Sequence, residues 1–230
     1  MADVDSIIKW LNEAADPTRL EHMKKYGINT EHALGISIYN LRRFAKEIPK
    51  NHNLALKLWM TGIHEAKMLA CFIDEPEKIT ANQMNKWAES FNSWDICDQT
   101  CTSLFDQSPL SWKKVFEWAE SEKEFVKRAA FSLIAGLCVH DKTAEDDKFE
   151  QFFSLIQTHA DDERNYVKKA VNWALRNIGK RNLYLNKKSI IFSQKLAKKN
   201  SKSAKWIAND ALRELQSDKI QYRLRRNVKY

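Results

Sequence analysis

The stretch FVKRAA at residues 125–130 recurs as YVKKAV at residues 166–171, and a looser copy, AKWIA, follows at residues 204–208. Arg128 and Lys169 hold the same place in the first two copies, 41 residues apart. Self-similarity at a period of about 35–45 residues, in text with helical spacing, is typical of stacked helix pairs. The repeat therefore predicts an all-α fold of the α-solenoid type, in which successive helix pairs build one curved surface.

A second match, of NWALR at residues 172–176 with NDALR at residues 209–213, extends the repeat toward the C-terminus. Apolar residues recur at spacings of three and four along most of the chain, and 5 Gly and 4 Pro leave little turn chemistry for β-hairpins. We expect five or six helix pairs in one domain over residues 1–218, then a loose, basic, aperiodic tail at residues 219–230. Helices are expected near residues 7–11, before residue 26, and near residues 41–48, 54–60, 64–73, 80–90, 94–105, 109–120, 122–139, 144–159, 162–179, 186–199 and 201–217.

The charge of the chain is unevenly distributed. The formal net charge is +8, yet residues 164–230 carry 19 Lys and Arg against 3 Asp and Glu. The remainder holds 19 basic and 27 acidic residues and is therefore mildly acidic. A basic half joined to an acidic half indicates an oriented surface for a polyanion, and nucleic acid is the leading candidate. A merely solvated, Lys-rich helical surface is the alternative.

Composition also limits the class of protein. Hydrophobic residues make up 43% of the chain, which excludes wholesale disorder. No run of about 18 apolar residues occurs, so we expect no membrane span. An N-terminus with Asp3 and Asp5 that turns amphipathic at once does not fit a secretory signal. We therefore expect a protein of a bacterial-type cytosol, cytoplasmic and associated with the nucleoid.

The sequence gives no sign of a metal site or a cofactor. Neither His140-Asp141 nor His64-Glu65 has the further partners of a metal-hydrolase motif, and there is no Gly-rich phosphate loop. The cysteines form no Cys-x-x-Cys motif and lack a spaced histidine pair, so we expect buried free thiols in a reducing cytosol rather than a zinc site. All four stand in apolar helical text: Cys71, Cys97, Cys101 and Cys138.

One set of polar and aromatic residues could form a site. Trp94 and Asp98 stand four residues apart and so face the same side of one helix. Arg128 and Trp173 lie in later helices, and all four would converge on one concave surface if the repeats stack in register. Three of the four also have an ordinary structural interpretation. Trp94 could be a core aromatic, Asp98 a surface or capping carboxylate, and Arg128 the anchor of a structural ion pair.

A series of short motifs covers residues 20–215, and through them the chain resembles a known family. The motifs are MKKY at 23–26, LGI at 34–36, LRR at 41–43, LW at 58–59, SWD at 93–95 with Asp98, KRAA at 127–130, and KKA at 168–170 with Trp173 and LR at 175–176. In them the chain is similar to the HEAT-like-repeat DNA alkylation repair proteins, the AlkD type of DNA glycosylase. The resemblance implies a solenoid of HEAT-like helix pairs, acting as a monomer on double-stranded DNA that contains alkylated bases. It also implies excision of purines alkylated on a ring nitrogen, such as N3-methyladenine and N7-methylguanine.

The resemblance also implies roles for single residues. Asp98 takes the position of the catalytic carboxylate, and Trp94 and Trp173 take those of the aromatics that flank the deoxyribose of the lesion. Arg128 falls at the same site, and Tyr26 matches a nearby aromatic. The basic second half would bind phosphates, so affinity for DNA should fall steeply with salt. Further candidates for DNA contact are Tyr166, Lys168, Lys169, Lys205 and Arg213.

The implied chemistry is consistent with a single carboxylate. A ring-methylated purine is already cationic, so it leaves as a neutral base and needs no general acid. Positive charge builds instead on the sugar, where a fixed carboxylate stabilises it. Two alternatives remain: a non-catalytic scaffold that binds damaged or branched DNA, and a protein-binding solenoid whose basic half meets an acidic partner.

Overall fold

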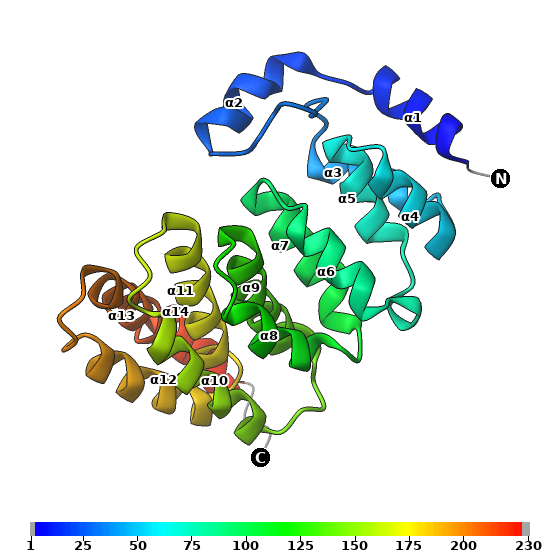
Figure 1. The fold of residues 1–230 in the computed structure, drawn as a ribbon. Helices are drawn as coiled ribbons and strands as arrows, with labels where there is room; N and C mark the ends of the chain where they lie inside the picture. Colours follow the sequence, from blue (N-terminus) through cyan, green and yellow to red (C-terminus); the bar gives the residue numbers. More distant parts are fainter. Residues whose placement is uncertain (1–2, 227–230) are drawn as a thin grey trace. The chain divides into compact units, whose positions relative to one another are not determined.

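The structure is a computed structural model that describes residues 3–226. Within this range all regular structure is helical, with 14 α-helices, three short 3-10 turns and no strand (Figure 1). The prediction of an all-α fold is therefore confirmed. The chain divides into two compact units, residues 1–109 and 110–230, and each is described by itself below. That residues 1–218 act as one continuous domain stays a prediction.

The first unit is built on a buried central helix. Helix α5 packs against α3, α4 and α7, and its residues Leu69, Ala70 and Cys71 are fully buried. Side chains of Asp3, Asn51 and Thr80 cap α1, α4 and α6 by accepting backbone N–H groups of the first turn. The helices are α1 (Val4–Glu13), α2 (Leu20–Lys25), α3 (Ile38–Ala45), α4 (His52–Met60), α5 (His64–Ile73), α6 (Ala81–Glu89) and α7 (Trp94–Ser103), with 3-10 turns at Pro17–Arg19, Pro76–Lys78 and Phe105–Gln107.

Between α2 and α3 the first unit contains a segment without regular structure, residues 26–37, which we call the α2–α3 loop. Gly35 in this loop has φ +82°, and a Cβ atom there would lie 2.1 Å from the carbonyl oxygen of Asp16. Only glycine fits both the left-handed backbone and this close approach. The loop therefore runs tightly over the helices instead of standing away from them.

The second unit is a stack of helices centred on α9. Helix α11 packs between α9 and α13, and the three contain the sequence repeats (Figure 1). Gly179 lets α11 approach α13, because a Cβ atom there would lie 2.7 Å from the Leu215 side chain. The helices are α8 (Ser111–Ala119), α9 (Glu124–His140), α10 (Asp146–His159), α11 (Asn165–Gly179), α12 (Leu183–Leu196), α13 (Lys202–Leu215) and α14 (Asp218–Arg226).

The C-terminal segment differs from its prediction as a loose, aperiodic tail. Residues 218–226 form helix α14, which packs on α13 and buries Ile220 and Leu224. Two apolar residues four positions apart are enough for one buried stripe, although the helix is otherwise polar and basic. The expectation is wrong for residues 219–226, and residues 227–230 lie outside the described part of the chain.

The cysteines are free thiols in the core, as predicted. All four are buried. Burial raises the pKa of the Cys71 thiol to about 12, so this group stays protonated at neutral pH. In residues 3–226 no helix is long and apolar enough to cross a membrane, and no cluster of three metal-binding side chains is found.

Candidate nucleic-acid interface

Helix α7 carries the candidate residues of the first unit on its first turns. Trp94 is its first residue and Asp98 follows one turn later, and both side chains are half-buried. The indole Nε1 of Trp94 donates a hydrogen bond of 2.9 Å to the backbone oxygen of Tyr26. This bond fixes the indole against the start of the α2–α3 loop. The predicted pairing of Trp94 and Asp98 on one helix is therefore present.

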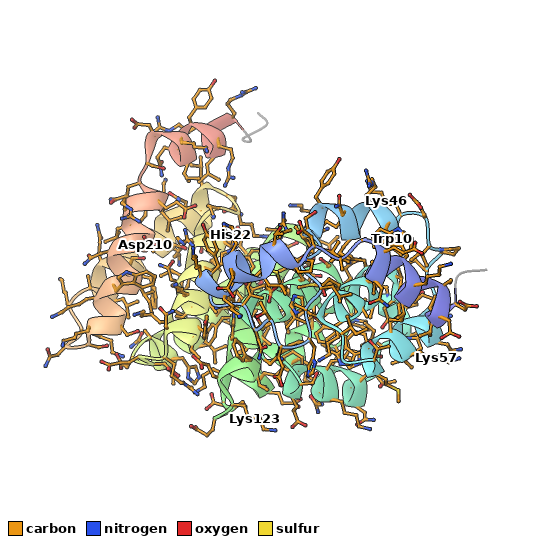
Figure 2. The ribbon with its side chains drawn as sticks, turned by 90° about the horizontal axis from the view of Figure 1, so that it is seen from above. Trp10, His22, Lys46, Lys57, Lys123 and Asp210 are labelled. Atoms are coloured by element: carbon orange, nitrogen blue, oxygen red, sulfur yellow. The ribbon has the colours of Figure 1, made fainter. Side chains whose placement is uncertain are left out.

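Tyr26 itself is close to Trp94 in space, although it is far away in sequence. Its side chain is 63% exposed, and its ring lies 4.7 Å from that of His22, one turn earlier on α2 (His22 is labelled in Figure 2). An exposed aromatic supplies a flat surface on which a sugar or base can stack. The structure thus places Tyr26 beside Trp94, and its role at the site stays a prediction.

A largely apolar pocket of about 370 Å³ lies next to Trp94 within the first unit. Its walls come from the 3-10 turn Pro17–Arg19, from α2, α3, α5 and α7, and from the α2–α3 loop. Its lining residues are Arg19, His22, Met23, Tyr26, Ile28, Ile36, Ser37, Ile38, Leu41, His64, Met68, Trp94, Asp95 and Gln99. Sequence reasoning missed this pocket, because its walls are contributed by segments up to 80 residues apart.

Two buried polar residues hold the surroundings of Trp94, and sequence reasoning gave them no role. His64 Nε2 lies 2.9 Å from Asp95 Oδ2. The Glu65 carboxylate accepts the backbone N–H groups of three successive loop residues, Leu34, Gly35 and Ile36. The only signal in the sequence was the presence of ionisable residues in otherwise apolar helical text.

The pKa shifts of the first pair agree in direction. Burial opposes charge on both groups. The hydrogen bond and charge of Asp95 outweigh it and raise the pKa of His64. For Asp95, burial acts to raise the pKa, but the hydrogen bond and charge of His64 outweigh it, so the pKa of Asp95 is lowered. Both shifts therefore favour the charged pair, an imidazolium beside a carboxylate.

Arg128, a candidate of the second unit, is buried, with 6% of its surface exposed. Its Nη1 donates a hydrogen bond of 2.6 Å to the backbone oxygen of Tyr166. The Tyr166 ring is half-buried and packs against Phe125 at 5.3 Å. Arg128 thus links α9 to the first turn of α11 through a backbone carbonyl, and its role in binding DNA stays a prediction.

The other candidates of the second unit lie on α11 and α13. Trp173 is half-buried on α11. Lys168 lies with its Nζ 5.2 Å from the centre of the Trp206 ring, and this indole is 40% exposed. Lys169 and Lys205 are exposed to solvent. Basic and aromatic groups therefore alternate near the starts of α11 and α13.

Not every basic residue of the repeat is available to a ligand. Arg213 is exposed but forms an ion pair with Asp210, one turn earlier on α13 (Asp210 is labelled in Figure 2). Lys127, which aligns with Lys168, is buried and lies 3.8 Å from Asp162. The repeated lysines thus differ in role from one copy to the next. Convergence of these residues with Trp94 and Asp98 stays a prediction.

Residues 7–215 match the sequence profile of a family described as DNA alkylation repair enzyme. The chain belongs to this family. No curated protein sequence matches the chain. The predicted membership of the DNA alkylation repair family is confirmed by this match, which spans nearly the whole chain.

Solved structures were compared with the fold of the chain. One is described as a new family of proteins related to the HEAT-like repeat DNA glycosylases with affinity for branched DNA structures. It has a TM-score of 0.77 at 17% sequence identity and covers 93% of this chain and 95% of its own. The HEAT-like-repeat solenoid fold is therefore confirmed. A designed armadillo repeat protein in complex with the peptide (KR)4 has a TM-score of 0.35, at 14% identity over 82% of this chain and 85% of its own.

Proposed function

We propose that this chain is a DNA glycosylase that binds duplex DNA and hydrolyses the N-glycosidic bond of N3- or N7-alkylated purines. The observation that carries the proposal is the first part of α7. There an indole anchored to the Tyr26 carbonyl stands one helical turn from Asp98, at half-buried positions that a substrate can reach. Membership of the DNA alkylation repair family supports the same assignment.

The chemistry needs one well-placed carboxylate. The alkylated purine is cationic, so it departs with the electrons of the bond from C1′ and becomes a neutral base. The positive charge passes to the sugar, which takes on oxocarbenium character, and a water molecule adds at C1′ and loses its proton to Asp98 or to solvent. A negative charge beside C1′ stabilises this transition state by about 3–4 kcal/mol, by analogy with other single electrostatic groups.

The aromatic and basic groups have separate roles in this proposal. The face of Trp94 would border the deoxyribose of the lesion, with Tyr26 as a nearby aromatic surface, because an electron-rich ring attracts a sugar that carries positive charge. Phosphates would be bound through exposed or half-buried lysines, namely Lys168, Lys169 and Lys205. We further propose that the protein acts as a monomer in a bacterial-type cytosol, where it associates with the nucleoid.

The first experiment measures release of methylated bases from methylated duplex DNA under single-turnover conditions. Wild type should release 3-methyladenine or 7-methylguanine. Asp98→Asn should be slower by about a hundredfold or more, because the lost stabilisation belongs to the transition state. DNA affinity should stay within about twofold, because the substitution removes no phosphate contact. Asp5→Asn, at an exposed carboxylate on α1, is the matched control and should keep the wild-type rate.

A second candidate function is recognition of branched DNA without excision. It is favoured by two observations. The structural relative described above has affinity for branched DNA, and Arg128 is engaged with a backbone carbonyl. The same preparation should be titrated with a four-way junction and with a duplex of equal length at several salt concentrations. Tenfold tighter binding of the junction, with no base released, would replace the glycosylase proposal with this one.

A further inference from the structure

Helices α5 and α7 begin side by side around a buried ion pair. His64 is the first residue of α5, and Asp95 is the second residue of α7. The two side chains meet at 2.9 Å and are only 8% and 14% exposed. A buried, charge-assisted hydrogen bond of this length restrains both partners. The beginnings of the two helices are therefore tied to each other by side chains, in addition to their packing.

Asp95 passes this restraint to the turn that carries Trp94. Its second oxygen, Oδ1, accepts the backbone N–H of Ile96 at 2.9 Å. The neighbouring Ser93 accepts the backbone N–H of Asn29 through its hydroxyl oxygen at 3.2 Å. The first turn of α7 is thus held on one side by α5 and on the other by the α2–α3 loop. The direction of the Trp94 indole depends on both.

The charge on His64 depends on several nearby groups. Burial and Lys67 oppose its protonation, whereas Asp95 and Glu65 favour it. The N-terminus of α5 also opposes a cation at its first residue. Arg19 and His22 face the same pocket from the 3-10 turn and α2, and the His32 carbonyl accepts the backbone N–H of His64 from the loop. Asp95 and Glu65 outweigh burial and Lys67, so the pKa of His64 is raised.

We propose that His64 is a positioning residue of the candidate site, which in its protonated form holds the first turn of α7 through Asp95 and so fixes Trp94 and, one turn later, Asp98. The inference rests on the proposed function for its effect on excision. It goes beyond that function because it assigns a charge-dependent role to a residue that contacts no substrate. His64 also borders the pocket beside Trp94, so its state is open to solvent protons.

The direction of the pH effect follows from the raised pKa. The charged pair is fully present below the ordinary histidine value of 6.5 and is lost as the pH rises through the higher value in the folded protein. A neutral imidazole can still form a hydrogen bond to Asp95, but without the charge the hold is weaker. Excision should therefore decrease on the alkaline side, while affinity for DNA changes little.

The test uses a signal that does not require catalysis. The indole N–H of Trp94 is followed by ¹H–¹⁵N NMR between about pH 6 and 9 in the full chain, with Trp94→Phe used only for assignment. In wild type this resonance should move with the same midpoint as the His64 imidazole. In His64→Arg, which keeps a cation at every pH, it should not move. Single-turnover excision is measured over the same range, after subtraction of spontaneous depurination.

Three variants separate positioning from simple stability. His64→Arg should excise at about the wild-type rate without the alkaline decrease. His64→Gln should excise about tenfold more slowly than wild type at pH 6, and its rate should not depend on pH. The reason is that a displacement of Asp98 by about 1 Å lowers the rate of the chemical step. His159→Gln is the matched control, because His159 is equally buried, at 8% exposure, and pairs with Glu120 in the second unit. It should keep the alkaline decrease.

The outcomes are distinguishable from those of the proposed function. A Trp94 resonance that does not follow the His64 titration overturns the positioning role, whatever the excision assay gives. An alkaline decrease that persists in His64→Arg overturns it as well. If the resonance follows His64 in a protein that releases no base, the coupling of His64 to Trp94 stands and the glycosylase proposal falls.

Discussion

The two units tie down their non-helical segments with opposite charges. In the first unit the buried Glu65 carboxylate accepts three backbone N–H groups of the α2–α3 loop. In the second unit the Arg181 guanidinium donates to three backbone oxygens, that of Cys138 in the last turn of α9 and those of Asp141 and Ala144 between α9 and α10. In both cases one charged side chain forms hydrogen bonds with three backbone groups.

The sign of the charge follows from the end of the helix at which the loop lies. Glu65 is on the first turn of α5, where the helix dipole favours an anion. Arg181 lies just past the C-terminal end of α11 and near that of α9, where a cation is favoured, and its guanidinium also stacks on Phe149 at 4.1 Å. The comparison teaches that a buried anion binds the N–H groups of the loop beside Trp94, whereas a cation that also stacks on an aromatic ring binds the carbonyl oxygens of the second unit.

The largest effect is expected for Glu65→Gln. The amide keeps one acceptor oxygen but turns an NH₂ group toward a backbone N–H that is buried and has lost its acceptor. Each such loss costs about 1–3 kcal/mol, and bonds to a charged group are the stronger ones, so unfolding should become easier by about 3–4 kcal/mol. Urea unfolding and amide hydrogen exchange at residues 34–36 measure this. Glu31→Gln, exposed in the same loop, should change stability by under about 0.5 kcal/mol. Equal effects of the two variants would refute the anchoring role of Glu65.

A smaller effect is expected for Arg181→Lys. Lysine keeps the charge and can still lie near Phe149, but its single ammonium cannot reach all three carbonyl oxygens in the fork geometry of a guanidinium. The loss should be about 2 kcal/mol in urea unfolding. Arg213→Lys, whose side chain is 81% exposed, is the control and should be close to neutral. If Arg181→Lys proved as harmless as the control, the stacking on Phe149 would be the main support of the loop and the carbonyl bonds secondary.

Much of the helical fold could be predicted from the sequence, because apolar spacing and capping residues are local features. The pairing of Trp94 with Asp98 on one helix follows from a spacing of four. Helix α14 was missed because only Ile220 and Leu224 mark its buried stripe, and the packing that stabilises it comes from α13. Periodicity is weak evidence when a helix is short and strongly charged.

The supports of the candidate site could not be predicted in the same way. Glu65 binds residues about 30 positions earlier, and His64 meets Asp95 31 positions later. Such pairs leave no periodic pattern in a single sequence, because they depend on how α5, α7 and the loop pack. Arg128 illustrates the opposite problem. The resemblance assigned it to the site, and its burial against the Tyr166 carbonyl became visible only in the structure.

The smallest effect is expected for Glu214, whose carboxylate pairs with charged side chains instead of backbone groups. Glu214 on α13 is partly exposed. Its carboxylate accepts hydrogen bonds from Arg176 of α11 and from Lys180, which directly follows α11. Burial works to raise the pKa of Glu214, but Lys180 and then Arg176 lower it. A lowered pKa means that the stabilisation is present above the ordinary value of 4.5 and is lost as the pH falls through the lower value in the folded protein.

Because water screens the interaction of Glu214 with Arg176 and Lys180, it should contribute only about 0.5–1 kcal/mol to the free energy of unfolding. The difference in unfolding free energy between wild type and Glu214→Gln should therefore be small at pH 7 and decrease as the pH falls below 4.5, whereas Glu163→Gln, at an exposed carboxylate, should show no difference at any of these pH values. A Glu214 effect as large as that of Glu65, or one that persists in acid, would mean that side-chain pairs anchor the helices as strongly as the charged groups that bind loop backbone.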